Sequence, residues 1–289
     1  MDGTMDEGYF PHTKVRQPML TLGLILDCDG TIAPNTSRQL VDWIGIDGDR
    51  FWHEVDAQEK NGWDSALVLI PKLIKEARKN GTVLTRTVLS SLARNHLQFS
   101  KGVPGVFIGL TRFVNRKAAE LHLTAAQEVH VITGGLVDLL VASALPSRVK
   151  EIWGCTLNFS DGGVALGPKS VVSFTEKTKY LFAVNKGISR ADLRAKPALV
   201  NSYQPLNARP IPLDRMIYVG DGPTDIHCFS VVIRGGGQTL GITRPGERRD
   251  PLDYRPRWGP YSLNWTSRSD LVAAVKDRLE DILVRSFSA

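Results

Sequence analysis

The chain has few cysteines and no long uninterrupted hydrophobic run. Its 289 residues include three cysteines, Cys28, Cys155 and Cys228, an odd number without the spacing of a metal site. A disulfide framework and a structural zinc site are therefore disfavoured, and we expect reduced thiols. The longest apolar stretches, around residues 20–26 and 129–132, are strand-sized, whereas a membrane span needs about 20 apolar residues. An integral membrane protein is therefore not expected.

Signals for secretion and for nucleic-acid binding are also missing. Residues 1–14 contain early acids and no basic region followed by an apolar core, so we expect a cytoplasmic protein. The net charge of +6 is modest, although arginines gather in residues 244–268. Such a cluster suits an anionic ligand, whereas nucleic-acid binding needs a clearer basic face with aromatic side chains. With 42% hydrophobic and 23% charged residues, the composition is that of a globular protein.

Apolar, strand-sized segments alternate with helical segments over most of the chain. Such alternation indicates a three-layer, Rossmann-like α/β fold with a mostly parallel sheet and right-handed connections. The expected strands are residues 20–26, 128–133, 151–157, 216–219 and 238–242. The expected helices are residues 106–121, 136–144, 176–185, 225–234 and 270–285. Residues 160–163 read as a turn, and residues 188–214 as a connecting segment.

Between the first strand and this alternating region, the pattern is helical throughout. Helices are expected over residues 49–60 and 85–97, and a third begins after Asp64, which is placed to cap it, and ends before Gly81. Pro71 leaves room for a kink in that helix. We therefore expect a small all-helical unit inserted after the first strand. The predicted organisation is an N-terminal arm at residues 1–18, an α/β core at 19–34 and 101–289, and the helical domain at 35–100.

Four polar clusters follow the expected strands or open a helix. They are residues 27–31, residues 133–135, Lys177 and residues 220–225. In an open α/β sheet such positions meet at the carboxyl ends of the strands, where ligands bind. Four carboxylates gathered there would repel one another and partly protonate unless a cation were present, and Mg²⁺ is the natural one for oxygen ligands. A threonine hydroxyl, glycine amides and an ammonium group add the donors that a phosphoryl group needs.

These residues carry a family resemblance. The motifs are DCDGT at residue 27, VITGG ending at residue 135, Lys177, and GDGPTD at residue 220, in this order. With them the chain resembles the haloacid dehalogenase superfamily of phosphohydrolases, in the branch of phosphoserine phosphatase, and the helical insertion resembles that branch's cap. Lys186 is a second candidate for the lysine of the third motif.

The resemblance implies a role for each matching residue. Asp27 would attack phosphorus and carry a covalent phosphate, and Asp29 would act as the acid and base. Thr133, Gly134 and Lys177 would bind phosphoryl oxygens. Mg²⁺ would be held by the set Asp27, Asp29 through its main-chain carbonyl, Asp221 and Asp225.

The expected activity is Mg²⁺-dependent hydrolysis of a small phosphorylated metabolite. An acid at Asp29 disfavours dehalogenation, and the lack of an acid between Thr31 and Asp42 argues against phosphoserine as substrate. Arg38, Arg50 and Arg86 of the cap are candidates to meet a substrate's second anionic group. A phosphotransferase, a catalytically silent phosphometabolite-binding protein and a phosphatase of nucleic-acid ends stay open as alternatives. The sequence makes no prediction of the oligomeric state.

Overall fold

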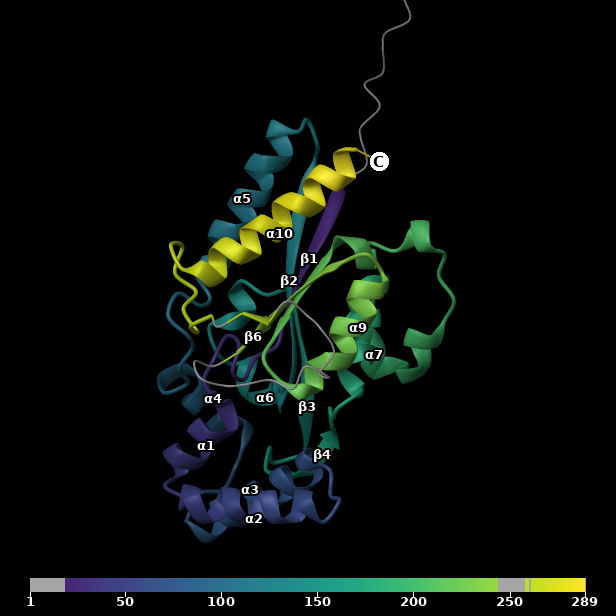
Figure 1. Cartoon of the computed structure of the whole chain (residues 1–289). Helices are drawn as coiled ribbons and strands as arrows, with labels where there is room; N and C mark the ends of the chain where they lie inside the picture. Colours follow the sequence, from purple (N-terminus) through teal and green to yellow (C-terminus); the bar gives the residue numbers. More distant parts are fainter. Residues whose placement is uncertain (1–18, 244–257, 260, 289) are drawn as a thin grey trace, which may run out of the picture.

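The fold is described from a computed structural model for residues 19–243, 258–259 and 261–288 (Figure 1). The predicted N-terminal arm and the arginine run at residues 244–257 lie outside the described residues. Among the described helices, none combines the length and the apolar character that crossing a membrane requires.

A seven-stranded sheet forms the centre of the fold, in the order β4-β3-β2-β1-β5-β6-β7. All neighbouring strands are parallel except β3 and β4. The strands are β1 (Leu20–Leu26), β2 (Ala125–Leu136), β3 (Glu151–Phe159), β4 (Ala165–Ser170), β5 (Met216–Gly220), β6 (Gln238–Ile242) and β7 (Trp258–Gly259). Because β1 pairs with β2 on one side and β5 on the other, the segments that leave these three strands meet at one edge of the sheet.

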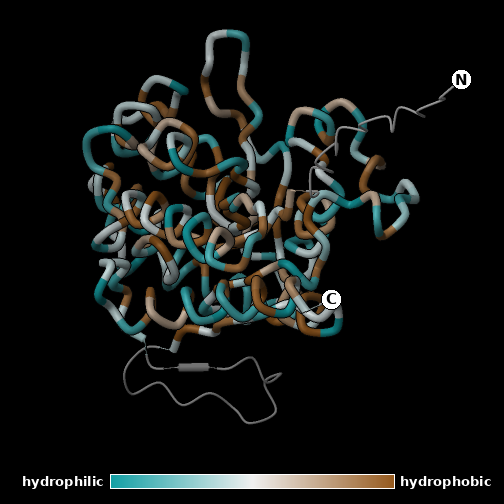
Figure 2. Tube along the Cα trace, turned by 90° about the horizontal axis from the view of Figure 1, so that it is seen from above, coloured by the Kyte–Doolittle hydropathy of each residue, from teal (hydrophilic) through white to brown (hydrophobic). Residues whose placement is uncertain are grey.

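Helices cover both faces of the sheet, so the predicted three-layer α/β fold is confirmed. Alternate residues of β1 face opposite sides: Leu24 packs with α5 (Val106–Glu120) and α10 (Asp270–Phe287), whereas Ile25 belongs to the apolar cluster of the other face. That second face carries α7 (Glu176–Lys186) and α9 (Ile226–Arg234). Hydrophobic and hydrophilic stretches alternate along the outer helices (Figure 2), as expected for helices with one buried face.

Four helices lie between β1 and α5 and group at one end of the molecule (Figure 1). They are α1 (Thr36–Ile44), α2 (Gly48–Lys60), α3 (Ser65–Lys79) and α4 (Arg86–Asn95). The Asp64 side chain accepts a hydrogen bond from the Ala66 amide at the start of α3, as predicted, and α3 runs on through Pro71. No named strand lies within described residues 36–95, which is the helical character expected of the cap.

The hairpin formed by β3 and β4 joins this helical segment to the sheet. The Arg86 amide donates to the Gly163 carbonyl at 3.1 Å, and the Ala165 amide donates to the Leu84 carbonyl at 2.8 Å. Strand β4 was not among the predicted strands because its sequence, ALGPKS, lacks β-branched residues and contains Gly167 and Pro168. Its place at the edge of the sheet tolerates a proline.

The structure also corrects several element boundaries. Strand β2 runs to Leu136, and the helix that follows, α6 (Val137–Leu140), is shorter than the predicted 136–144. The predicted connecting segment contains a short helix, α8 (Arg190–Ala195), with a capping box at Ser189. Three 3₁₀ turns, Pro197–Asn201, Leu206–Ala208 and Leu213–Arg215, follow α8. Further 3₁₀ turns are Leu145–Ser147 and Pro223–Asp225.

Candidate active site

Three carboxylates from the first and fourth motifs, DCDGT and GDGPTD, come together at the edge of the sheet. Asp27 follows β1, Asp221 follows β5, and Asp225 lies directly before α9. One oxygen of each carboxylate lies within 4.8 Å of the others. The parallel pairing of β1 with β5 produces this convergence, since it aligns the residues that leave both strands.

A lysine lies among these carboxylates. The Lys177 Nζ atom is 2.9 Å from Asp27 Oδ1 and 2.7 Å from Asp225 Oδ1, and the side chain is 1% exposed. Burial alone would lower the pKa of Lys177, but the charges of Asp225 and Asp27 raise it, and the net shift is upward. Lys186 instead donates to the carbonyls of Val200 and Ser202. Of the two candidate lysines, Lys177 is therefore the one in contact with the acidic cluster.

Asp225 is held by donors from three directions. Besides Lys177, the Tyr218 hydroxyl donates to Oδ1 at 2.8 Å and the Gly222 amide donates to Oδ2 at 3.0 Å. A Cβ atom on Gly220 would lie 2.4 Å from this carboxyl group, so a larger residue there would displace it. Burial raises the pKa of Tyr218, which keeps its hydroxyl protonated as a donor.

Asp27 is buried, and its carboxylate is in an environment that disfavours a negative charge. Its Oδ1 atom accepts from the Cys28 amide at 2.7 Å as well as from Lys177. Burial is the largest cause that raises the pKa of Asp27, followed by the nearby charge of Asp225, while Lys177 opposes them. One ammonium group is thus insufficient to balance the cluster, and a further cation would favour the ionised form.

Asp221 approaches the first motif closely at Gly30. The backbone of Gly30 has φ +77°, a left-handed conformation that favours glycine. A Cβ atom at this position would lie 2.0 Å from Asp221 Oδ2. Glycine is therefore required in DCDGT both by its backbone conformation and by the approach of a carboxylate from the fourth motif.

Asp29 faces the glycines of the second motif, near the end of β2. Its Oδ1 atom accepts from the Thr36 amide at 2.7 Å. Its Oδ2 atom and the hydroxyl oxygens of Thr36 and Thr133 all lie within 3.3 Å of the point that a Cβ atom on Gly135 would occupy. Burial raises the pKa of Asp29, partly offset by the hydrogen bond from the Thr36 amide. This carboxyl group is therefore biased toward the protonated form that an acid catalyst needs.

The second motif contributes a hydroxyl and an exposed glycine. Thr133 is fully buried and its hydroxyl accepts from the Gly135 amide at 2.9 Å. Gly134 between them is exposed to solvent. All four predicted clusters therefore gather at one edge, with Asp29 and Thr133 beside the three-carboxylate group.

The residues fit the magnesium ion that the family resemblance implies. The donors are carboxylate oxygens, which Mg²⁺ prefers, and the site holds more negative than positive groups. Of the predicted ligand set, Asp27, Asp221 and Asp225 form the group that could hold an ion. The Asp29 side chain is directed to Thr36 and Gly135 instead, which leaves its main-chain carbonyl for the role given to it above.

The three arginines predicted to lie in a cap contact other side chains of the helical segment or of β3. Arg50 pairs with Glu76 at 3.4 Å. Arg38 lies over the Trp52 ring at 4.6 Å from its centroid, and Arg86 lies 3.9 Å from the centroid of Phe159. An arginine stacked on an aromatic ring keeps donors free to meet an anion.

Trp265 is hydrogen-bonded to the backbone of the first motif. Its indole Nε1 atom donates to the Thr31 carbonyl at 2.8 Å, and its amide donates to the Lys101 carbonyl at 2.8 Å.

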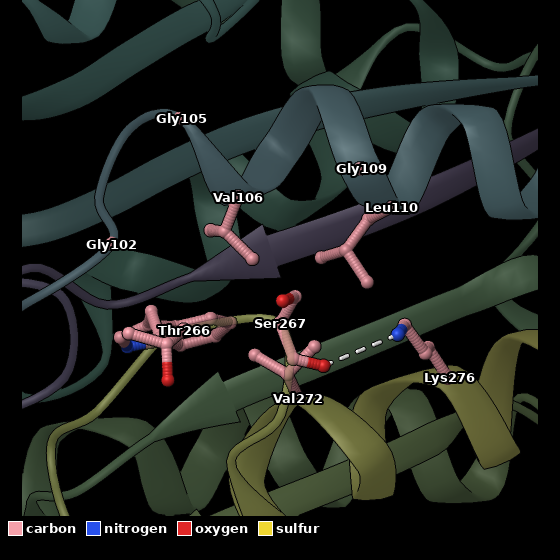
Figure 3. A pocket seen from close by; sticks show the side chains of 10 residues that line it. Gly102, Gly105, Val106, Gly109, Leu110, Thr266, Ser267, Val272 and Lys276 are labelled. Carbon is pink, nitrogen blue, oxygen red and sulfur yellow. Dashed lines mark hydrogen bonds between the residues drawn. The ribbon is translucent and has the colours of Figure 1, made fainter.

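A cavity of about 370 Å³ lies beside Trp265, at the start of α5 and α10. It is lined mainly by glycine and apolar side chains, with Lys276 at one side (Figure 3). None of the site carboxylates lines this cavity, so it is separate from the acidic cluster.

Sequence reasoning missed Tyr218 and Thr36. Tyr218 is the polar side chain of an otherwise apolar strand, two residues before the GDG of the fourth motif, and this placement was a usable signal. Thr36 follows the first motif at the start of a helix, and nothing in its sequence surroundings marked it as a neighbour of Asp29.

Comparison with known proteins supports the fold. No family model matches the chain. An uncharacterized protein of Borreliella burgdorferi is 23% identical over 287 residues, covering 89% of this chain and 96% of that protein.

Two solved structures that resemble the chain are a hydrolase and a phosphatase. The chain matches a HAD family hydrolase from Salmonella enterica serovar Typhi with a TM-score of 0.49 and 16% identity, covering 79% of this chain but only 65% of that one. A phosphoserine phosphatase, solved as an analogue of its phospho-aspartyl intermediate, matches with a TM-score of 0.51 and 13% identity. That match covers 89% of this chain and 99% of the phosphatase. The chain therefore shares its fold with phosphoserine phosphatase.

Proposed function

We propose that this protein is a Mg²⁺-dependent phosphatase that hydrolyses a small phosphomonoester through a covalent phosphate on Asp27. The observation that carries the proposal is the buried contact of Lys177 with both Asp27 and Asp225. This contact places a cation beside a carboxylate at the ligand-binding edge of the sheet, where an incoming phosphoryl group needs positive charge. The fold shared with phosphoserine phosphatase is consistent with this chemistry.

In the first step, Asp27 displaces the alcohol from phosphorus. Because Oδ1 already accepts from the Cys28 amide and Lys177, we assign the attack to Oδ2. The new bond joins Oδ2 to phosphorus, the bond from phosphorus to the ester oxygen breaks, and the electron pair stays on that oxygen. Asp29 then gives its proton to this oxygen, which leaves as the alcohol.

In the second step, water removes the phosphoryl group. Asp29, now ionised, takes a proton from a water molecule whose oxygen attacks phosphorus. The bond between phosphorus and Asp27 Oδ2 breaks, which restores the carboxylate and releases inorganic phosphate. The raised pKa of Asp29 favours the protonated acid at the start of the cycle.

Other residues of the site bind and orient the substrate. Lys177, the Thr133 hydroxyl and the amide of the exposed residue Gly134 are the donors that we assign to phosphoryl oxygens. Asp27, Asp221, Asp225 and the Asp29 carbonyl would hold Mg²⁺, which when bound supplies positive charge between the anionic nucleophile and the anionic substrate. Residues 35–100, as a cap, would select the substrate, since α1 reaches Asp29 through Thr36.

Phosphate release from a panel of phosphorylated metabolites, with and without Mg²⁺, tests this proposal. We expect turnover that requires Mg²⁺ and is lost in Asp27→Asn. Asp161→Asn, at an exposed turn, is the matched control and should retain full activity. Transfer of phosphate to an added alcohol would favour a phosphotransferase. Binding of a panel member without turnover would favour the catalytically silent alternative and refute the phosphatase.

A further inference from the structure

The contact between Asp29 and Thr36 joins the α/β core to the helical segment. The Thr36 amide donates to Asp29 Oδ1 at 2.7 Å. Thr36 is the first residue of α1 and is only 1% exposed. Since the early amides of a helix have no partner within that helix, the Thr36 amide is available to a carboxylate from outside it.

The same contact distinguishes the two oxygens of Asp29. An oxygen that accepts an N–H bond at this distance is the acceptor of the pair, so a proton on the carboxyl group belongs on the other oxygen. That oxygen, Oδ2, is the one that lies with the Thr133 hydroxyl around the Cβ position of Gly135. The proton is therefore directed to the end of β2, to which we assign phosphate binding.

We propose that Thr36 is a positioning residue for the acid and base of the reaction, acting through its main-chain amide on Asp29. This inference rests on the proposed phosphatase activity and adds a residue outside its four motifs. Thr36 fixes Oδ1 and thereby presents the proton on Oδ2 to the leaving oxygen of the substrate. Because Thr36 opens α1, and its side chain also lies at Gly135 of β2, the acid is oriented only while α1 is seated against the core.

A proline at residue 36 puts a ring carbon in place of the amide hydrogen, so it removes the hydrogen bond and displaces Asp29 Oδ1, with little change to the helix. Thr36 is the first helical residue, where proline is well tolerated. The preceding Asn35 has ψ 113°, which suits a residue before proline. Thr36→Ala keeps the amide and removes the hydroxyl, so the comparison of the two variants isolates the amide. Ser65→Pro, at the exposed first residue of α3 after Asp64 with ψ 132°, is the matched control for the proline itself.

The readout is the dependence of the reaction on the leaving group. A p-nitrophenolate ion leaves without a proton, whereas an alkoxide needs one, so loss of the acid slows the first step only for alkyl phosphates. Loss of the base slows release of phosphate from Asp27 for both substrates. We expect Thr36→Pro to lower kcat for an alkyl phosphate by roughly 10- to 100-fold. With p-nitrophenyl phosphate it should show a rapid burst of about one p-nitrophenolate per active site, followed by slow turnover. Ser65→Pro should behave like the wild type, and Thr36→Ala, which keeps the amide, should show no burst.

The possible outcomes separate this inference from the proposed function. Thr36→Pro with wild-type kinetics, or with the same loss for both substrates and no burst, overturns the role of Thr36 and leaves the phosphatase intact. A wild-type protein that releases no phosphate from either substrate overturns the proposed function instead. If Thr36→Pro does not fold, as judged by circular dichroism, an ester in place of the 36 amide, introduced with the α-hydroxy acid of threonine, removes the same hydrogen and is measured in the same way.

Discussion

Replacement of Lys177 by methionine is the sharpest test of the acidic cluster. The ammonium group is 1% exposed and contacts two carboxylates at 2.9 and 2.7 Å. Its removal would leave Asp27 and Asp225 buried without this counter-charge. Breaking a buried ion pair by removal of one partner costs about 3–5 kcal/mol, so we expect the free energy of unfolding of Lys177→Met to fall by about this amount.

Urea unfolding measures this loss, and Lys186→Met provides the control. Lys186 donates to the carbonyls of Val200 and Ser202, of which Ser202 is exposed and its carbonyl can be rehydrated. We expect a loss of only about 1–2 kcal/mol for that variant. For Lys177→Met, with an m value of about 3 kcal/mol/M for a chain of this size, the midpoint should fall by roughly 1 M or more.

The pH dependence gives a further check with a defined sign. Without Lys177, the pKa of Asp27 in the folded state should rise further above its unfolded value. A group with a raised pKa in the folded state favours folding at low pH and opposes it as pH rises. The deficit of Lys177→Met should therefore be smaller at about pH 5 than at about pH 8. A loss below about 1 kcal/mol, or a larger loss in Lys186→Met, would refute the central role of Lys177.

Two further predictions address the first motif and the sheet. Gly30→Ala should reduce phosphate release by at least roughly 10-fold, since its Cβ atom would displace Asp221. The control is Gly62→Ala, at a position with φ +89° and open space around it, which should lose stability but keep its activity. Equal activity of the two variants would contradict the argument. Hydrogen bonding from His130 lowers the pKa of Glu128. Above the ordinary glutamate pKa, the wild type should therefore be more stable than Glu128→Gln. This difference in the free energy of unfolding should be lost as pH falls through the lowered pKa. Urea unfolding between about pH 6 and about pH 3 measures this difference, and a difference that grows toward acid would show the sign to be wrong.

The sequence was sufficient for the parts of the fold in which pattern and environment agree. Strand β1 was predicted at its observed bounds because a continuous apolar run ending at an acidic turn is typical of a central parallel strand. The convergence of Asp27 with Asp221 followed from the rule that parallel strands end at one edge. Strand β4 could not be predicted, since its pairing with β3 and its contact with the helical segment stabilise a sequence of low strand propensity.

Within the site, the order of motifs predicted which residues meet but not how they are bonded. Spacing could not decide between Lys177 and Lys186, which lie on the same helix, α7. The structure distinguishes them by direction: Lys177 reaches the carboxylates, whereas Lys186 reaches the carbonyls that follow α8. Tyr218 was missed because a tyrosine within an apolar strand also reads as an ordinary core residue.

The hydrogen bonds of the site carboxylates could not be predicted from residue types, because main-chain amides donate many of them. The amides of Cys28, Gly222 and Thr36 each donate to one of the carboxylates Asp27, Asp225 and Asp29. Every residue except proline supplies such a donor, so these hydrogen bonds constrain the backbone path and not the identity of the side chain. The Cys28 side chain illustrates this freedom. It is buried in the apolar cluster that β1 forms with α5 and α10, and burial raises the pKa of its thiol. A site built in this way can keep its geometry in chains of low sequence identity, provided that the motif aspartates and the glycines they crowd against are retained.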